Sequence, residues 1–238
     1  MIRDPELSRR EAISRAVLAG GTVLVTGATM LGAEQEAVQE PDEAEVKVTP
    51  PEDLMREHAV LERLLLIYEK ALSAGSRPAD WPMKQLTDAV RLVRTFIEDY
   101  HEKLEEDYIF PRFEKAGKLT DLTAILRKQH DAGRRETDTI LRRIQQTASM
   151  ADMQPLANHL TTFIRMYRPH AARESTVLFP QLSSVVKPDE YDEMGETFEE
   201  IEHQKFGPAG FEGVVQNVAE IEKNLRIYDL ASFTPKLT

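Results

Sequence analysis

Four stretches of this chain carry apolar residues at alternating steps of three and four, and each stretch includes a histidine among them. That spacing places the apolar side chains on one face of an α-helix. The four stripes run over residues 54–72, 86–108, 119–144 and 156–177. Loops with glycine or proline separate them, and no stretch with a period of two competes. The sequence therefore predicts an all-α fold, an antiparallel up-down-up-down four-helix bundle with short connections.

The second and fourth stripes repeat one short pattern at the same spacing. The segment "HEKLEEDYIFP" begins at His101 and "HAARESTVLFP" begins at His170. In each segment a glutamate follows four residues on, at Glu105 and Glu174, and a Phe-Pro pair follows nine residues on. Residues i and i+4 lie one above the other on a helix, so each pair presents an imidazole and a carboxylate to one point.

The first and third stripes each hold a lone histidine, His58 and His130. If all four helices turn their stripes inward, four imidazoles and two carboxylates meet inside the bundle. Burying such groups without partners costs several kcal/mol each, so a bound cation is the better explanation of the pattern. The predicted metal ligands are His58, His101, Glu105, His130, His170 and Glu174.

The composition limits the metal and the partners. The chain has no cysteine, which excludes disulfides and thiolate metal sites and favours an ion that accepts imidazole and carboxylate ligands, notably iron. A net charge of -11 over 238 residues leaves no basic surface for nucleic acid. We therefore expect a non-haem metal protein with no nucleic-acid partner.

The first 33 residues differ from the rest. Arg9 and Arg10 precede an apolar run that ends at Ala33, which is the order of a secretory signal. The Ser8-Arg9-Arg10 start resembles a twin-arginine signal. The sequence predicts that the twin-arginine export machinery delivers the protein to the periplasm of a bacterial cell envelope. Residues 1–33 are either cleaved or kept as an anchor, and no later segment is apolar enough to span a membrane.

Three further regions follow this segment. Residues 34–53 are acidic with three prolines, which predicts a solvated linker. Residues 54–182 form the predicted metal-binding bundle. Residues 183–238 contain two more amphipathic stretches, which we expect to be additional helices packed on the bundle.

At the residues of the metal pattern the sequence resembles the hemerythrin-like (HHE cation-binding) family, whose pattern is H…HxxxE…H…HxxxE on a four-helix bundle. The resemblance covers residues 54–182, including both Phe-Pro pairs. It implies two non-haem iron ions bridged by an oxygen atom and by Glu105 and Glu174, with the four histidines as terminal ligands. The expected function is binding, storage or sensing of dioxygen or a related small molecule.

One position departs from the family pattern. Oxygen-carrying hemerythrins have a second histidine four residues after the one on the third helix, and this chain has Arg134 there. Two octahedral irons that share three bridges then keep two ligand positions open. His203 is a candidate for one of them if the fifth helix folds over the bundle end, and Glu102 is a reserve ligand. Gly133, next to this position, is expected to leave room for an incoming ligand.

Several functions remain open at this point. A site with open iron positions also suits an enzyme that acts on peroxide or nitric oxide, so whether the chain is an enzyme stays undecided. A metal-free helical interaction module is a further alternative. A ferritin-like reading is also possible, because Glu98 with His101 and Glu200 with His203 fit ExxH. It leaves His130 and three other predicted ligands unexplained.

Overall fold

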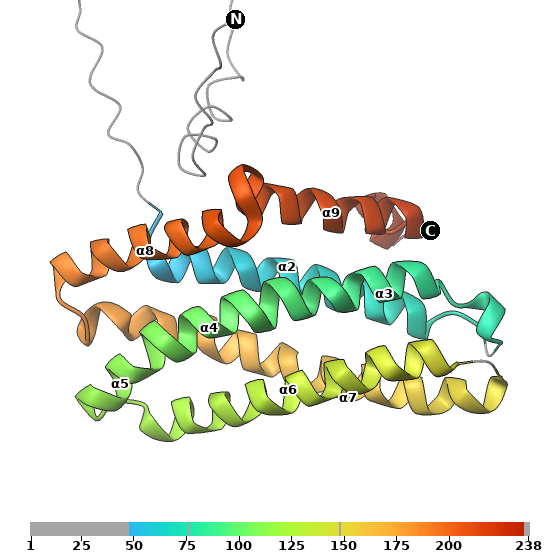
Figure 1. Cartoon of the computed structure of the whole chain (residues 1–238), viewed down its shortest axis with the longest axis horizontal. Helices are drawn as coiled ribbons and strands as arrows, with labels where there is room; N and C mark the ends of the chain where they lie inside the picture. The colour runs from blue at the N-terminus through green and yellow to red at the C-terminus, as the bar shows by residue number, and fades with distance from the viewer. Residues whose placement is uncertain (1–47, 76, 148, 236–238) are drawn as a thin grey trace, which may run out of the picture. The chain divides into compact units, whose positions relative to one another are not determined.

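A computed structural model describes residues 48–75, 77–147 and 149–235, and over these residues the chain is helical with no β-strand (Figure 1). The predicted all-α class is therefore confirmed for this part of the chain. The predicted signal and residues 34–47 of the predicted linker lie outside the described residues. Over the described residues no helix is both long enough and apolar enough to cross a membrane.

The helices divide into four long segments and two C-terminal helices. The four segments are α2 (Pro50–Leu72), a second segment built from α3, α4 and α5, then α6 (Thr120–Gln146) and finally α7 (Met150–Arg173). Within the second segment, α3 (Met83–Leu92), α4 (Glu102–Leu104) and α5 (Phe110–Ala116) are joined by π-helical stretches at Val93–His101 and Glu105–Ile109. A π-helical stretch, Glu174–Leu178, and a 3-10 turn, Phe179–Ser184, continue α7. The C-terminal helices are α8 (Pro188–Phe206) and α9 (Gly210–Leu225).

The first helix starts earlier than the sequence predicts, at Pro50 instead of Leu54. Pro50 and Pro51 occupy its first turn. Amide hydrogens in the first turn have no partner within the helix, so their absence from proline costs no hydrogen bond. Thr49 caps the helix: its side chain accepts a hydrogen bond from the Glu52 amide, and the Glu52 side chain accepts one from the Thr49 amide. The prolines that read as linker therefore form a helix start.

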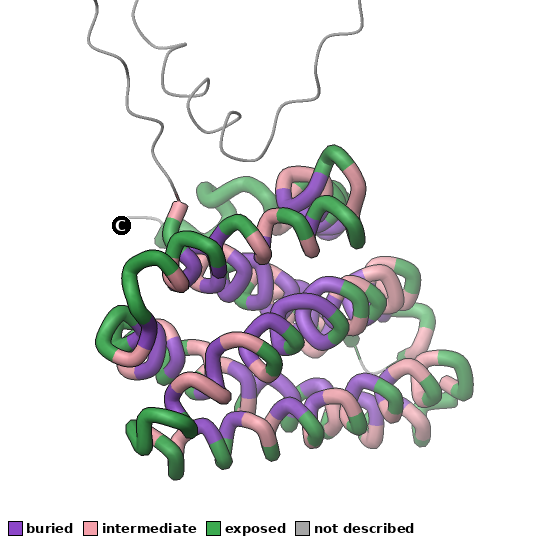
Figure 2. Tube along the Cα trace, turned by 60° about the vertical axis from the view of Figure 1, so that its left-hand side comes forward, coloured by how far each residue is buried: buried purple, intermediate pink, exposed green. Residues whose placement is uncertain are grey.

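The four long segments lie side by side, and the chain reverses direction at each connection between them (Figure 1). Helix α2 contacts α3 and α7, and α6 contacts α3 and α7. Helices α8 and α9 lie along one side of this group, where both contact α2. Figure 2 shows that buried residues follow the inward sides of the helices, as the apolar stripes predict.

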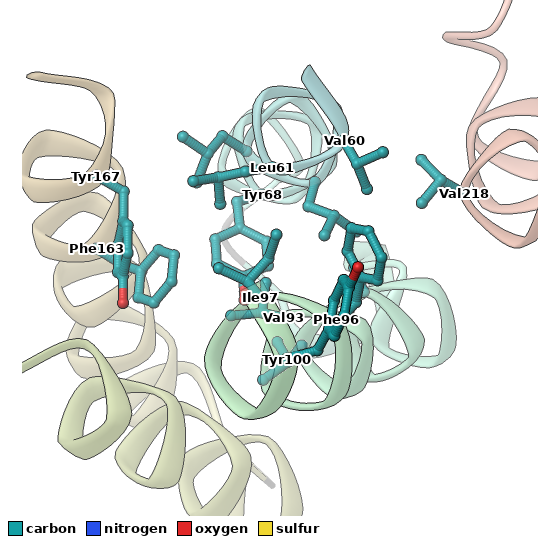
Figure 3. Packing of buried hydrophobic residues seen from close by; sticks show 14 of the residues in the cluster. Val60, Leu61, Tyr68, Val93, Phe96, Ile97, Tyr100, Phe163, Tyr167 and Val218 are labelled. Atoms are coloured by element: carbon teal, nitrogen blue, oxygen red, sulfur yellow. The ribbon is translucent and has the colours of Figure 1, made fainter. Parts of the chain in front are cut away.

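Large aromatic side chains fill the space between the helices. Tyr68 on α2 and Phe163 on α7 pack with ring centroids 5.5 Å apart, and Tyr167 lies 4.3 Å from Phe163 (Figure 3). All three are fully buried or nearly so. Aromatic pairs at such separations add to the stabilisation that comes from burying their area. This layer lies beside the cluster of histidines described below, because Tyr167 also contacts His170.

A salt bridge fastens α9 to α2. Glu222 on α9 accepts hydrogen bonds from Arg63 on α2, at 3.0 Å from Nε and 2.5 Å from Nη2. Glu222 is buried, whereas the Lys223–Glu220 pair on the same helix is exposed. The Arg63–Glu222 pair is thus the more buried of the two and joins α2 to α9, whereas the Lys223–Glu220 pair lies within α9.

We expect Glu222→Ala to lower the free energy of unfolding by about 2 kcal/mol, because it leaves the Arg63 guanidinium beside a buried surface without its partner. Glu220→Ala, which removes the exposed pair, is expected to cost less than about 0.5 kcal/mol. Urea unfolding followed by circular dichroism measures both. Equal effects of the two substitutions would show that the salt bridge does not hold α9 in place.

Candidate metal centre

Both glutamates of the repeated pattern begin π-helical turns. Glu105 starts the stretch Glu105–Ile109 and Glu174 starts Glu174–Leu178, and each stretch ends where a Phe-Pro pair begins. Proline donates no backbone hydrogen bond and crowds the carbonyl four residues before it. The wider π turn ahead of each pair accommodates that crowding. Such π turns in α-helices frequently occur at functional sites.

The structure brings the four bundle histidines and the two glutamates together. His58 on α2, His101 at the end of a π stretch, His130 on α6 and His170 on α7 are all buried, as are Glu105 and Glu174. Two groups of ligand atoms each lie within 4.8 Å of one another: Glu105, His130, His170 and Glu174 form one group, and His58, His101 and Glu105 form the other. The six side chains thus form two adjacent groups that share Glu105.

Each glutamate contacts one imidazole of each group. The Oε2 atom of Glu105 is 3.7 Å from His101 Nε2 and 3.4 Å from His130 Nε2. The Oε2 atom of Glu174 is 3.3 Å from His58 Nε2 and 3.1 Å from His170 Nε2. Carboxylates placed between two imidazole pairs have the arrangement of bridging ligands.

The residues fit a cation because their inward atoms lack other partners. Both side-chain oxygens of Glu105 and both of Glu174 are buried without a hydrogen bond, as is Nε2 of His58. The Nε2 atoms of His130 and His170 face each other at 3.2 Å. Buried polar groups that are left unsatisfied are costly, and a cation among these atoms would satisfy all of them.

Outward-facing hydrogen bonds orient the two histidines of the HxxxE pairs. His101 Nδ1 lies 2.8 Å from Glu57 Oε2, and His170 Nδ1 lies 2.9 Å from Gln129 Oε1. The amide oxygen of Gln129 and the carboxylate oxygen of Glu57 are both acceptors, so each Nδ1–H donates a hydrogen bond outward. The lone pair on Nε2 of each ring then points inward. Glu57 and Gln129 are the residues immediately before His58 and His130, so the two halves of the site repeat one design.

The lone histidines are held by a second repeated contact. His130 Nδ1 lies 3.0 Å from Glu106 Oε1, and His58 Nδ1 lies 2.8 Å from Ser175 Oγ. Glu106 and Ser175 are the residues immediately after Glu105 and Glu174. All four imidazoles therefore have an outer partner, a carboxylate for His101 and His130 and a neutral group for His58 and His170.

The phenylalanines of the two Phe-Pro pairs cover the lone histidines. Phe110 stacks on His130 with centroids 5.5 Å apart, and Phe179 stacks on His58 at 5.3 Å. Both phenylalanines are buried. Each repeated segment thus places its phenylalanine, nine residues after its histidine, against the lone histidine of a different helix.

Arg134 is part of a polar network beside the site. Its Nη2 lies 2.8 Å from Glu102 Oε2 and 2.6 Å from Glu106 Oε1. Tyr167 donates a hydrogen bond of 2.6 Å to Glu102 Oε1. Glu102 thus contacts both Arg134 and Tyr167. At the position where the family pattern has a further histidine, this chain has a guanidinium that pairs with two acids.

Gly133 does not leave an open space, contrary to the expectation from sequence. A Cβ atom at this position would lie 1.9 Å from Tyr167 Oη. The tyrosine fills the room that the missing side chain provides.

His203 is not brought to the site. It is exposed on α8, and it belongs to none of the groups of possible ligands found among the described residues. Its neighbour Glu202 is the residue that α8 turns inward, where it accepts a hydrogen bond of 2.9 Å from the Phe211 amide. The fifth helix therefore packs through Glu202, and the placement of His203 argues against its role as a ligand.

Burial sets the protonation states expected of the metal-free centre. Burial lowers the pKa of His58, His101 and His130 to about 4, so these imidazoles are neutral at pH 7. Burial raises the pKa of Glu105 well above its usual range, and the charges of Glu174 and Glu102 add to the effect. For Glu174, contacts with His170 and His58 outweigh burial and hold its pKa well below the usual range. The two carboxyls of the facing pair therefore have pKa values shifted in opposite directions.

These pKa values predict how many protons leave when metal binds. When ferrous iron binds under anaerobic conditions, His58, His101 and His130 are expected to release no more protons at pH 6 than at pH 7.5. Histidines with an ordinary pKa are roughly three quarters protonated at pH 6 and would release about two additional protons from three imidazoles. Here they are already neutral at both pH values. Calorimetry in buffers of different ionisation enthalpy counts the protons, and a rise of about two protons per chain at pH 6 would contradict the lowered pKa values.

The outer partners of the histidines are not among the residues predicted from the sequence. Glu57 had a detectable signal, because it lies three residues after Leu54 and four before Leu61 and therefore falls within the apolar stripe. Gln129 and Ser175 had none, because they are ordinary polar residues until the opposite helix is in place. The stacking of Phe110 and Phe179 on the lone histidines likewise depends on contacts between helices.

Comparisons with known proteins agree with the geometry. Residues 49–182 match the family described as hemerythrin HHE cation binding domain. The chain is 51% identical over 197 residues to an uncharacterized protein of Mycobacterium tuberculosis, an alignment that covers 81% of this chain and 76% of the relative. An uncharacterized protein of Mycobacterium bovis matches with the same identity and coverage. No solved structure matches significantly.

Proposed function

Because the chain belongs to the hemerythrin HHE cation-binding family, we propose that it holds two non-haem iron ions and binds dioxygen or a related small molecule with them. His58 and His101 would hold one ion, His130 and His170 the other, and Glu105 and Glu174 would be shared between them. The observation that carries the proposal is the set of inward oxygens on both glutamates that are buried without a hydrogen bond. The family fold, an up-down-up-down four-helix bundle, is part of the proposal and is supported by the chain reversals in Figure 1.

The chain's own residues would orient the ligands and keep the centre dry. The four Nδ1 contacts fix the rings so that each Nε2 points inward. Phe110 and Phe179 cover two of the imidazoles and exclude water from that side. When bound, the iron ions would supply a Lewis-acidic, redox-active centre for a small oxygen or nitrogen species.

Export to the periplasm through the twin-arginine machinery is also part of the proposal. It rests on the order of residues in the first 33 positions, which lie outside the described part of the chain. That machinery carries proteins after folding, which suits a buried centre that must be loaded before the helices close around it.

The direct test is iron content together with the absorption spectrum of full-length protein from iron-fed cells. Two irons per chain, with a near-ultraviolet absorption that bleaches on reduction, are the expected result. Folded helical protein with no bound metal would contradict the proposal and favour the metal-free interaction module.

A di-iron enzyme acting on peroxide or nitric oxide is the second candidate. The observation that favours it is the hydrogen bond between Tyr167 and Glu102, a buried hydroxyl and carboxyl pair beside His170. Such a pair can hold a proton close to the centre. Steady consumption of peroxide by iron-loaded protein, reduced in Tyr167→Phe with iron content unchanged, would support the enzyme. A gas complex that releases its ligand under vacuum would support the binding protein.

A further inference from the structure

A groove between α2 and α7 leads from the surface to the candidate metal centre. It encloses about 290 Å³, and its inner end is formed by His58 and by Ser175, the hydrogen-bond partner of His58. Leu61 and Leu65 from α2 and Tyr167 from α7 line its walls. Several small molecules fit in this volume, because one water occupies about 30 Å³ of the liquid. One face of a candidate ligand therefore borders a space that opens outward.

Small side chains keep this groove open. Ala59 on α2 and Ala171 and Ala172 on α7 line its outer part, where larger side chains would fill the gap between the two helices. His58 is the most exposed of the four inward histidines, at 7% against 4% for His170 and less for the other two. The exposure of the site is thus greatest on the groove side.

The groove is uncharged inside and has ion pairs at its mouth. Arg168 on α7 pairs with Glu62 at 2.8 Å and with Glu69 at 2.6 Å, both on α2. The three charges lie across the gap between the helices, and Glu62 and Arg168 also line the groove. The inner walls carry apolar side chains, part of the Tyr167 side chain and the hydroxyl of Ser175. An ion that entered would leave water without a fixed opposite charge inside the groove, whereas an uncharged molecule meets no such barrier.

The outer partners of the imidazoles also make the two sides of the centre differ. The histidines that contact Glu105 are backed by the carboxylates of Glu57 and Glu106. His58, at the groove, is backed by the neutral Ser175. The groove therefore reaches the centre at an imidazole whose outer partner is a neutral hydroxyl.

We propose that this groove is the route and holding site for a small uncharged molecule, of the size of dioxygen or nitric oxide, on its way to the metal centre. The inference rests on the proposed function for its destination. The apolar character of the groove and its size are independent of any metal. The two parts are therefore tested separately.

Xenon tests the groove without requiring iron. In full-length protein with labelled methyl groups, xenon pressure is expected to shift the methyl signals of Leu61, Leu65 and Ala171. Ala171→Leu, which fills the groove, is expected to abolish the shifts at both leucines. Ala157→Leu is the matched control, because Ala157 is also a half-buried alanine on α7 but lies outside the groove. Absence of the shifts in the wild-type protein, or their persistence in Ala171→Leu, would overturn the proposal.

Nitric oxide tests the route. In ferrous protein with equal iron content, Ala171→Leu is expected to slow nitric oxide association at least tenfold in stopped flow, and Ala157→Leu to leave it unchanged. An unchanged rate in Ala171→Leu would show that ligands reach the centre another way. If the chain bound no iron, the proposed function and the route to a metal would fail together. The xenon result would still decide whether the groove takes up small apolar molecules.

Discussion

Replacing Glu105 by methionine is expected to change stability in opposite directions in the metal-free and the iron-loaded protein. Both oxygens of Glu105 are buried without a hydrogen bond, and the residue contacts imidazoles of both ligand groups. Without metal, the substitution removes a buried polar group and leaves an apolar side chain of similar volume. The free energy of unfolding should then stay equal or rise by about 1 to 4 kcal/mol. With iron bound as proposed, the variant loses a shared ligand, so we expect iron content to fall from the proposed two per chain toward zero.

The melting temperature with and without chelator, together with iron analysis, measures both effects. The stabilisation that bound metal confers on the wild-type protein grows with the ratio of free iron to its dissociation constant, so it disappears in a variant that no longer binds. A Glu105→Met protein that keeps two irons, or that is destabilised equally with and without metal, would mean that Glu105 has a structural role only.

Glu98→Met is the matched control for this experiment. Glu98 is also a fully buried glutamate, seven residues before Glu105 on the same long segment. It differs in having partners, because Thr137 donates a hydrogen bond to it and Arg94 Nη1 lies 2.8 Å from its Oε2. Removing a carboxylate that has a hydrogen bond from Thr137 and an ion pair with Arg94 should lower the free energy of unfolding, by about 3 kcal/mol, and leave iron content unchanged. The two variants should therefore separate in both stability and metal content.

The sequence and the structure agree best where a single helix decides the outcome. The three-and-four spacing predicts the helices and the inward direction of His58, His101, His130 and His170, and the structure is helical with these residues buried. The spacing of four between histidine and glutamate depends only on helix geometry, so the pairing of each imidazole with its carboxylate could be foreseen. The family assignment followed from that spacing and is confirmed by the comparison.

Contacts between two helices could not be predicted from the spacing of residues along one helix. The partner of each Nδ1 atom comes from an opposite helix, and nothing in the local sequence of Ser175 distinguishes it from an exposed serine. The sequence offers His203 as a candidate ligand only if α8 turns it inward, and the residue that α8 buries is its neighbour Glu202. The sequence predicts the first helix to begin too late, because prolines interrupt helix interiors but are accepted in the first turn, where Pro50 and Pro51 lie.

The clearest case of such a contact is Gly133, where helix propensity and packing predict effects of opposite sign. Glycine in a helix interior is less favourable than alanine by about 1 kcal/mol, so propensity alone predicts that Gly133→Ala stabilises the protein. The structure predicts the reverse, because the new Cβ would lie 1.9 Å from Tyr167 Oη and 2.6 Å from Cζ. Tyr167 cannot easily yield, since it packs on Phe163 and donates a hydrogen bond to Glu102.

We therefore expect Gly133→Ala to lower the free energy of unfolding by about 2 kcal/mol, the usual range for overpacking a filled core. In a Tyr167→Ala background the obstacle is gone, and the same substitution should stabilise the protein by about 1 kcal/mol through helix propensity. Denaturant unfolding of the four proteins in this double-mutant cycle measures the coupling. Stabilisation by Gly133→Ala in the wild-type background would show that Tyr167 does not occupy the space over the glycine. The hydroxyl that reaches Glu102 beside the metal centre would then have to lie elsewhere.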